Sequence, residues 1–182
     1  MAIGGCIQKI SEALNPVSEE IEADAAVVLL LKSVGRNIKV LFVKRVENPN
    51  DPWSGQIALP GGKRDAKDRN LKQTVIRETF EETHINLHEG CRFLGAMEPL
   101  WSTRRPDMKI LPFVVLLKKK KPISLNEELT GYFWALLKEL AKHRGTTKFS
   151  FGEYPAYIIE NHVVWGLTYR ILNKLINIIE NS

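Results

Sequence analysis

The sequence predicts an α+β fold in a single domain over residues 1–182. Two observations indicate this fold. Apolar segments rich in β-branched residues occur in two groups, and each group is followed by a segment whose apolar residues have helical spacing. The length of 182 residues and the hydrophobic content of 44% are typical of one globular domain. We find no internal repeat, low-complexity segment or linker that would divide the chain.

The first 23 residues are expected to form an N-terminal extension to the domain. Within it, residues 7–14 have the pattern of a short helix that ends before Pro16. Residues 18–23 are polar and acidic, and we expect a solvated connection there. The regular part of the domain therefore begins near Ala25.

Two strands joined by a hairpin are expected next, at residues 25–31 and 38–45. Gly35 and Asn37 between them suit a tight turn. Residues 47–55 contain two prolines, two asparagines and a glycine, and are expected to form a surface loop.

A helix is expected from Leu71 to about Glu82, after a short strand at residues 56–62. Either Asp68 or Asn70 is available as its N-cap.

The second group of strands is expected at residues 91–100 and 109–118, and a C-terminal helix at residues 163–181. The apolar residues of this helix have the spacing of one stripe, which either packs on the core or forms a dimer contact. They are Leu167, Ile171, Leu172, Leu175, Ile178 and Ile179.

Charge and cysteine content place few limits on function. The net charge of +5 favours acidic substrates or nucleic acid, but such a balance is common in proteins that bind neither. The run Lys118–Lys121 has no interleaved aromatic residues and is expected to be a solvated turn. Cys6 and Cys91 have no disulfide or zinc-ligand pattern. No apolar run approaches the ~20 residues that span a bilayer, so we expect a cytoplasmic protein without membrane contact.

The most informative segment is the acidic end of the helix expected from Leu71. Glu78, Glu81 and Glu82 share one helix face, and Arg77 is placed to reach Glu81. Like charges at this spacing each cost a few tenths of a kcal/mol. A solvated acidic face is one interpretation. The other is a hard divalent cation, Mg²⁺ or Mn²⁺, bound by these carboxylates and by carbonyl groups near Gly62.

On these residues the chain resembles the Nudix hydrolases, whose box contains a glycine, a distant glutamate and an Arg-Glu-Φ-x-Glu-Glu-x-Gly-Φ turn, with Φ apolar. Three departures occur. Asp68 stands in place of the usual glutamate, one additional residue precedes Arg77, and Thr79 and His84 replace the apolar residue and the final glycine. We expect His84 to adopt a left-handed conformation that ends the helix. The matching positions are Gly62, Asp68, Arg77, Glu78, Glu81, Glu82 and Ile85.

Within that family the chain is most similar to the coenzyme A diphosphatases. The similar segments are residues 59–68, the tetrapeptide 75–78, residues 45–62 with Arg45, Gly55 and Gln56, and residues 163–172. Residues 48–53 depart from the Leu-Arg and histidine pattern of that subgroup. The resemblance covers about Ala25 to Leu172.

The resemblance implies a mixed β-sheet sandwiched between α-helices, and metal-dependent hydrolysis of a nucleoside diphosphate linked to another group. It implies metal binding by Glu78, Glu81 and Glu82 with Gly62, and positioning of a glutamate by Arg77. Asp68 is either an outer ligand or a helix cap. The general base is open among Glu81, Glu98, Glu127 and Glu128, of which we name Glu128.

Several cationic and aromatic residues are candidates for substrate binding. The loop from Trp101 to Lys109 is the most suggestive, because a tryptophan, two arginines and a lysine occur in it. The four histidines have no metal-ligand spacing and are expected to be structural. The phosphate-binding candidates are Arg45, Lys63, Arg64, Arg104, Arg105 and Lys109, and the stacking candidates are Trp53, Trp101 and Phe151.

Three functions follow as hypotheses. The first is a hydrolase of coenzyme A or a related nucleoside diphosphate derivative. The second is a hydrolase of nucleoside triphosphates or of RNA 5′ ends, with RNA as a less favoured substrate. The third, of another class, is an inactive nucleotide- or RNA-binding module, against which the intact Arg77, Glu78, Glu81 and Glu82 argue. A small nucleotide is the expected partner, and a homodimer is possible.

Overall fold

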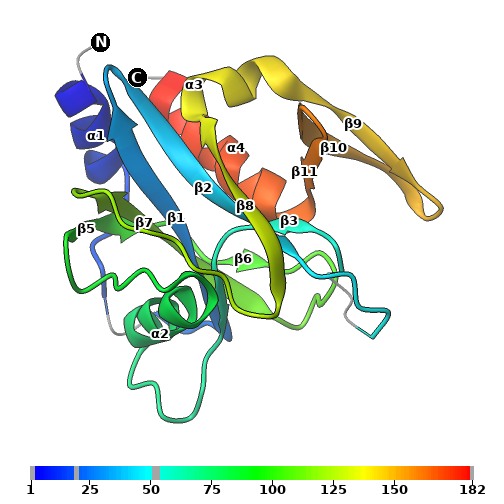
Figure 1. Ribbon diagram of the computed structural model, residues 1–182, viewed down its shortest axis with the longest axis horizontal. Coiled ribbons are helices and arrows are strands. Elements are labelled where there is room, and N and C mark those ends of the chain that lie inside the picture. The colour runs from blue at the N-terminus through cyan, green and yellow to red at the C-terminus, as the bar shows by residue number, and fades with distance from the viewer. Residues whose placement is uncertain (1–2, 19–20, 51–53, 181–182) are drawn as a thin grey trace.

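A mixed β-sheet lies between helices in the computed structural model, which describes residues 3–18, 21–50 and 54–180 (Figure 1). The α/β/α arrangement is confirmed. Helix α2 (Leu71–Thr83) covers one face of the sheet. The other face is covered by α1 (Ile3–Glu12), α3 (Leu137–Leu140) and α4 (Gly166–Glu180).

The main sheet has the strand order β3-β2-β1-β7-β5, with β4 paired to β1, β6 to β7 and β8 to β2. Strands β1 and β7 are parallel and the other pairs are antiparallel. The strands are β1 (Ala25–Val34), β2 (Asn37–Arg45), β3 (Ile57–Ala58), β4 (Gly61–Lys63), β5 (Cys91–Ala96), β6 (Leu100–Trp101), β7 (Lys109–Leu117) and β8 (Leu129–Leu136).

The predicted hairpin of β1 and β2 is confirmed, but its strands pair only near the turn, from Leu31↔Val40 to Val34↔Asn37. Beyond that point they separate. Strand β3 then pairs with β2, and β4 pairs with β1. The segment with the two glycines therefore lies in the open end of the hairpin, where it faces helix α2.

Helix α2 has the predicted extent. The side chain of Asn70 accepts a hydrogen bond from the backbone N–H of Gln73 at 3.0 Å, so Asn70, not Asp68, is the N-cap. His84 ends the helix in the left-handed conformation at φ 58°, as predicted, and its N–H donates to the Phe80 carbonyl.

No strand was predicted between residue 118 and the C-terminal helix. Residues 129–136 form strand β8, which pairs with β2 in antiparallel orientation, and the four-residue helix α3 follows it. A second, antiparallel sheet was not predicted. It consists of β9 (Arg144–Phe149), β10 (Gly152–Ile159) and β11 (His162–Trp165), in the order β11-β10-β9.

Both terminal helices begin at positions other than those predicted. Helix α1 begins at Ile3 and ends at Glu12, whereas residues 7–14 were expected. The C-terminal helix α4 begins at Gly166, because residues 163–165 pair with β10 as part of β11. The stripe of α4 packs into the chain's own core through Ile171, Leu172, Leu175 and Ile176. These residues support the core interpretation, whereas Leu167, Ile178 and Ile179 of the stripe are partly exposed and the dimer contact stays a prediction.

Candidate active site

Two glycines place the loop before α2 directly against that helix. Gly61 has φ 139°, and a Cβ on it would fall on the backbone carbonyl of Ala26. A Cβ on Gly62 would fall on the carboxylate of Glu78. A side chain at Gly61 would collide with backbone, and one at Gly62 would displace the Glu78 carboxylate. The two glycines therefore bring the loop backbone into contact with the acidic face of α2.

Glu82 and Glu78 are the carboxylates that this loop covers. Glu82 is 4% exposed, and its Oε2 accepts the Gly61 N–H at 2.9 Å. Burial, with a smaller contribution from the negative charges of Glu78 and Glu128, raises the pKa of Glu82 to about 8. Burial also raises the pKa of Glu78, despite its hydrogen bond to Arg77. Bringing a positive charge to this pair would stabilise the ionised carboxylates.

Arg77 holds the acidic turn and the preceding loop together. Its Nη1 donates to Glu78 at 2.8 Å and to Glu81 at 3.2 Å, and its Nη2 donates to the Lys63 carbonyl at 3.1 Å. The same guanidinium forms a two-point ion pair with Asp68, at 3.1 Å and 2.8 Å. This pairing lowers the pKa of Asp68 to about 2 and raises that of Arg77.

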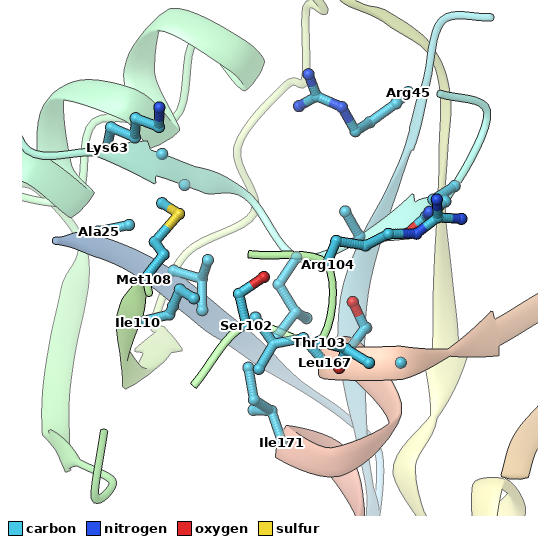
Figure 2. Close-up of a pocket in the computed structure, with 18 of the residues that line it drawn as sticks. Ala25, Arg45, Lys63, Ser102, Thr103, Arg104, Met108, Ile110, Leu167 and Ile171 are labelled. Carbon is cyan, nitrogen blue, oxygen red and sulfur yellow. The ribbon is translucent and has the colours of Figure 1, made fainter. Parts of the chain in front are cut away.

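A cavity of about 340 Å³ opens over these carboxylates. Figure 2 shows the residues that line it, drawn from several separate elements. Acidic side chains at its wall are Glu78, Glu82 and Glu128, and basic ones are Arg45, Lys63 and Arg104. The apolar part of the wall includes Val27, Met108, Ile110, Leu167 and Ile171.

The N-terminal end of α4 also reaches this cavity, through Gly166, Leu167 and Thr168. The first backbone N–H groups of a helix lack intrahelical partners and carry a partial positive charge, which favours anions such as phosphate. The similarity of residues 163–172 to the coenzyme A diphosphatases was noted from the sequence, but no site role was assigned to them. The spacing of residues 166–168 in the sequence does not indicate that they line the same cavity as Glu78.

Other predicted site residues lie away from the cavity. The side chain of Glu81 is 53% exposed and contacts Arg77 from the solvent side. It does not line the cavity with Glu78 and Glu82, and metal binding by all three carboxylates stays a prediction. Gly62 does lie at the cavity wall.

Among the general-base candidates, Glu128 lines the cavity, directly before β8 and not in a helix. Its backbone is held on both sides, since its carbonyl accepts the Val46 N–H at 2.8 Å and its N–H donates to Asn126 Oδ1 at 3.1 Å. Glu98 instead accepts a hydrogen bond from Asn15 at 2.6 Å, and Glu127 is exposed outside the cavity lining.

The predicted phosphate-binding residues divide into two groups. Arg45, Lys63 and Arg104 line the cavity. Arg64 does not, because its guanidinium donates to the carbonyls of Asp68 and Arg69 and so closes the loop before α2. Arg105 is paired with Asp107 at 3.6 Å, also outside the cavity lining.

The aromatic candidates lie outside the main cavity too. Trp101 is 50% exposed, with the Lys109 ammonium 4.9 Å from its ring centroid. Phe151 is 53% exposed and lies beside Arg104, whose Cζ is 5.1 Å from the ring centroid. Trp53 lies outside the described residues. Neither Trp101 nor Lys109 reaches the carboxylates, because β6 and β7 direct this end of the loop to the surface.

The oxygen donors at the cavity fit a hard divalent cation. In the described ranges no three His, Cys, Asp or Glu side chains lie close enough together to form a complete metal site. The buried Glu82, the partly buried Glu78 and the exposed Glu128 nevertheless line one cavity beside the backbone of Gly62. Mg²⁺ is commonly bound by one or two carboxylates while it keeps several waters. Glu78 and Glu82 are the residues that would hold it.

The mixed sheet between helices and the two-glycine loop packed against an acidic helix turn define a domain of the Nudix type. A family model of the NUDIX domain matches residues 22–154. The chain therefore belongs to the Nudix hydrolase family.

Two curated relatives are about 30% identical to this chain over the aligned part. The peroxisomal coenzyme A diphosphatase ndx-8 of Caenorhabditis elegans is 31% identical over an alignment of 154 residues, and the alignment covers 77% of this chain and 64% of the relative. The mitochondrial coenzyme A diphosphatase NUDT8 of Homo sapiens is 29% identical over an alignment of 156 residues that covers 80% of this chain and 65% of the relative. The chain thus spans slightly less than two thirds of the length of these relatives.

A solved structure of similar fold is the MutT/nudix family protein from Enterococcus faecalis, with a TM-score of 0.59 at 19% identity. The alignment covers all of this chain and 71% of that one. At this identity the likeness concerns the fold. Among the described residues, none of the helices combines the length and apolar character needed to cross a bilayer.

Proposed function

We propose that the protein hydrolyses the diphosphate linkage of a nucleotide derivative, with Mg²⁺ or Mn²⁺ held by Glu78 and Glu82. The observation that supports this most directly is the composition of one cavity wall, where three carboxylates face three cationic side chains. Binding of a diphosphate uses both kinds of side chain. The carboxylates hold the metal ion that binds the phosphate oxygens, and the arginine and lysine side chains neutralise the remaining charge of those oxygens.

Each group at the cavity has a role in this proposal. Arg45 and Lys63 bind non-bridging oxygens of the diphosphate, Arg104 binds a phosphate oxygen from the edge of the cavity, and the N-terminal end of α4 favours the same charge. Arg77 positions Glu78 and acts on substrate only through that carboxylate. In this proposal the exposed Glu128, which lines the cavity, accepts a proton from the attacking water. When bound, the cation neutralises the diphosphate and lowers the pKa of a coordinated water.

Coenzyme A and its derivatives are the substrate class that we favour. The names of ndx-8 and NUDT8 describe coenzyme A diphosphatases. The apolar part of the wall, from Met108 and Ile110 to Leu167 and Ile171, suits a substrate half that is not a nucleotide. The cytoplasmic location expected from the sequence stays a prediction.

A substrate screen tests the proposal. Coenzyme A, ADP-ribose, dinucleoside polyphosphates and nucleoside triphosphates are incubated with the protein and Mg²⁺ or Mn²⁺, and the products are identified by mass. We expect cleavage of coenzyme A between its two phosphates. Turnover of nucleoside triphosphates alone would contradict the substrate assignment, and absence of metal-dependent turnover with every compound would contradict the function.

A further inference from the structure

A second cavity adjoins the one over the carboxylates. It measures about 340 Å³, and residues of β2 and β3 in the main sheet and of β9 and β11 in the small sheet line it. Gln56, Arg104 and Trp165 line both cavities. The two cavities therefore share part of their walls, and a ligand that occupied both would pass these three side chains.

The second cavity differs from the first in charge. Its wall contains Lys44, Arg104 and His162, and none of the described residues that line it is acidic. In the described part of the chain, no carboxylate forms an ion pair with Lys44 or Arg104. Two cations that face one space without an acidic partner favour an anionic ligand there.

Arg104 is held where it can serve this cavity. Its Cζ is 5.1 Å from the ring centroid of Phe151 and 5.5 Å from that of Trp165. Phe149 packs on Trp165 with a centroid distance of 4.3 Å, which fixes the aromatic surface under the arginine. A guanidinium that stacks on rings through its faces keeps the N–H groups at its edge for hydrogen bonds to phosphate.

Neutral hydrogen-bonding groups complete the wall. Ser54 and Gln56 come from the loop before β3, Thr147 comes from β9, and Asn161 from the turn before β11. A site of two cations, a histidine and several hydroxyl and amide groups matches a phosphate monoester, whose oxygens accept several hydrogen bonds. A phosphate monoester that is bound but not cleaved does not need metal-binding carboxylates like those of the first cavity.

We infer that this second cavity binds a further phosphate of the substrate, separate from the diphosphate that is cleaved. The inference rests on the proposed function, because it takes the cleaved diphosphate to lie in the first cavity. It narrows the substrate class to nucleotides that carry an additional phosphomonoester. Coenzyme A has such a group on its ribose, whereas 3′-dephospho-coenzyme A lacks it and ADP-ribose has none.

The test compares kcat/KM for coenzyme A and for 3′-dephospho-coenzyme A, using the whole chain with Mg²⁺. We expect the wild type to prefer coenzyme A by about tenfold or more, since one charge-assisted phosphate contact contributes on the order of a factor of ten. Lys44→Gln should remove most of this preference, mainly through KM. Lys39→Gln, which changes a lysine on the same strand outside both cavities, should keep it.

Binding of adenosine 3′,5′-bisphosphate and of AMP, measured by calorimetry, separates this inference from the proposed function. One outcome would support the phosphate site and contradict the proposed function. The protein would then hydrolyse neither coenzyme A nor 3′-dephospho-coenzyme A, but it would bind the bisphosphate more tightly than AMP, and Lys44→Gln would remove this difference in affinity. Equal wild-type affinities together with equal kcat/KM values would overturn the inference. So would a preference for coenzyme A that Lys44→Gln leaves unchanged.

Discussion

The guanidinium of Arg77 binds both carboxylate oxygens of Asp68, with Nε–Oδ1 and Nη2–Oδ2 distances of 3.1 Å and 2.8 Å. Asp68 is 7% exposed, and its Oδ2 also accepts the N–H of Asp65. This pair connects the loop after β4 to the acidic turn of α2. It fixes the plane of Arg77, and through Arg77 the carboxylate of Glu78, which lies 2.8 Å from Nη1.

Arg77→Lys should lower hydrolysis without unfolding the protein. A lysine retains the charge but cannot bind Asp68 at two points and Glu78 at the same time. Loss of such an orienting partner typically costs 10- to 100-fold in metal affinity or activity, so we expect kcat/KM to fall roughly 10- to 100-fold. Arg69→Lys, an exposed change in the same loop, is the control. Equal activity of Arg77→Lys and the control would refute the positioning role.

Stability in acid should depend on Asp68. Its folded-state pKa is about 2, below its ordinary value of 3.8, so its contribution to stability is present above pH 3.8 and is lost as the pH falls toward 2. The shift corresponds to about 2 kcal/mol. In urea unfolding between pH 5 and pH 2, the wild type should lose more free energy of unfolding than Asp68→Asn. Parallel pH profiles of the two proteins would show that Asp68 has no such role.

Gly62→Ala should disable the site with a moderate loss of stability. The new Cβ would occupy the position of the Glu78 carboxylate, which must then move. Displacement of a catalytic group by about 1 Å can cost about 100-fold in rate, and overpacking typically costs about 1–3 kcal/mol. Gly131→Ala on β8 is a matched control, because a Cβ there has no atom within 4 Å. Kinetics and thermal unfolding of both variants check this, and normal activity in Gly62→Ala would contradict it.

The apolar stripe of α4 should behave as core. Leu172 is fully buried, so Leu172→Ala should lower the free energy of unfolding by about 2–5 kcal/mol, whereas the exposed Lys174→Ala should change it by about 0.5 kcal/mol or less. The unfolding midpoint should not vary with protein concentration. A midpoint that rises with concentration, together with a dimeric mass that Leu172→Ala abolishes, would return the stripe to a dimer contact.

Local patterns predicted the parts of the fold that depend on neighbours in sequence. The β1–β2 hairpin follows from two apolar runs around Gly35, and α2 and its end at His84 follow from helical spacing and from the tolerance of histidine for positive φ. Asp68 and Asn70 are chemically similar cap candidates two residues apart. Spacing could not decide between them, because the choice depends on the bond from Asp68 to Arg77, nine residues away.

Contacts between distant segments could not be predicted in the same way. The small sheet β9–β11 consists of half-exposed strands with mixed polar residues, whose pattern is weak until they pair. Arg104 and Arg105 are adjacent in sequence, yet only Arg104 reaches the cavity, since the loop turns between them. The side of α2 on which Glu81 lies likewise depends on how the helix packs, so the sequence could not separate it from Glu78 and Glu82.

The most direct test of the proposed metal site is coenzyme A hydrolysis by the wild type and by Glu82→Gln, each with and without Mg²⁺. A glutamine at position 82 can still accept the Gly61 N–H. The substitution also removes a buried carboxylate whose pKa is raised to about 8, and the charge of that carboxylate opposes folding increasingly as the pH rises from 4.5 toward 8. Glu82→Gln should therefore fold at least as stably at pH 8 without metal. We expect Mg²⁺-dependent turnover in the wild type and a loss of 100-fold or more in the folded variant, whereas unchanged Mg²⁺-dependent turnover in Glu82→Gln would contradict the account.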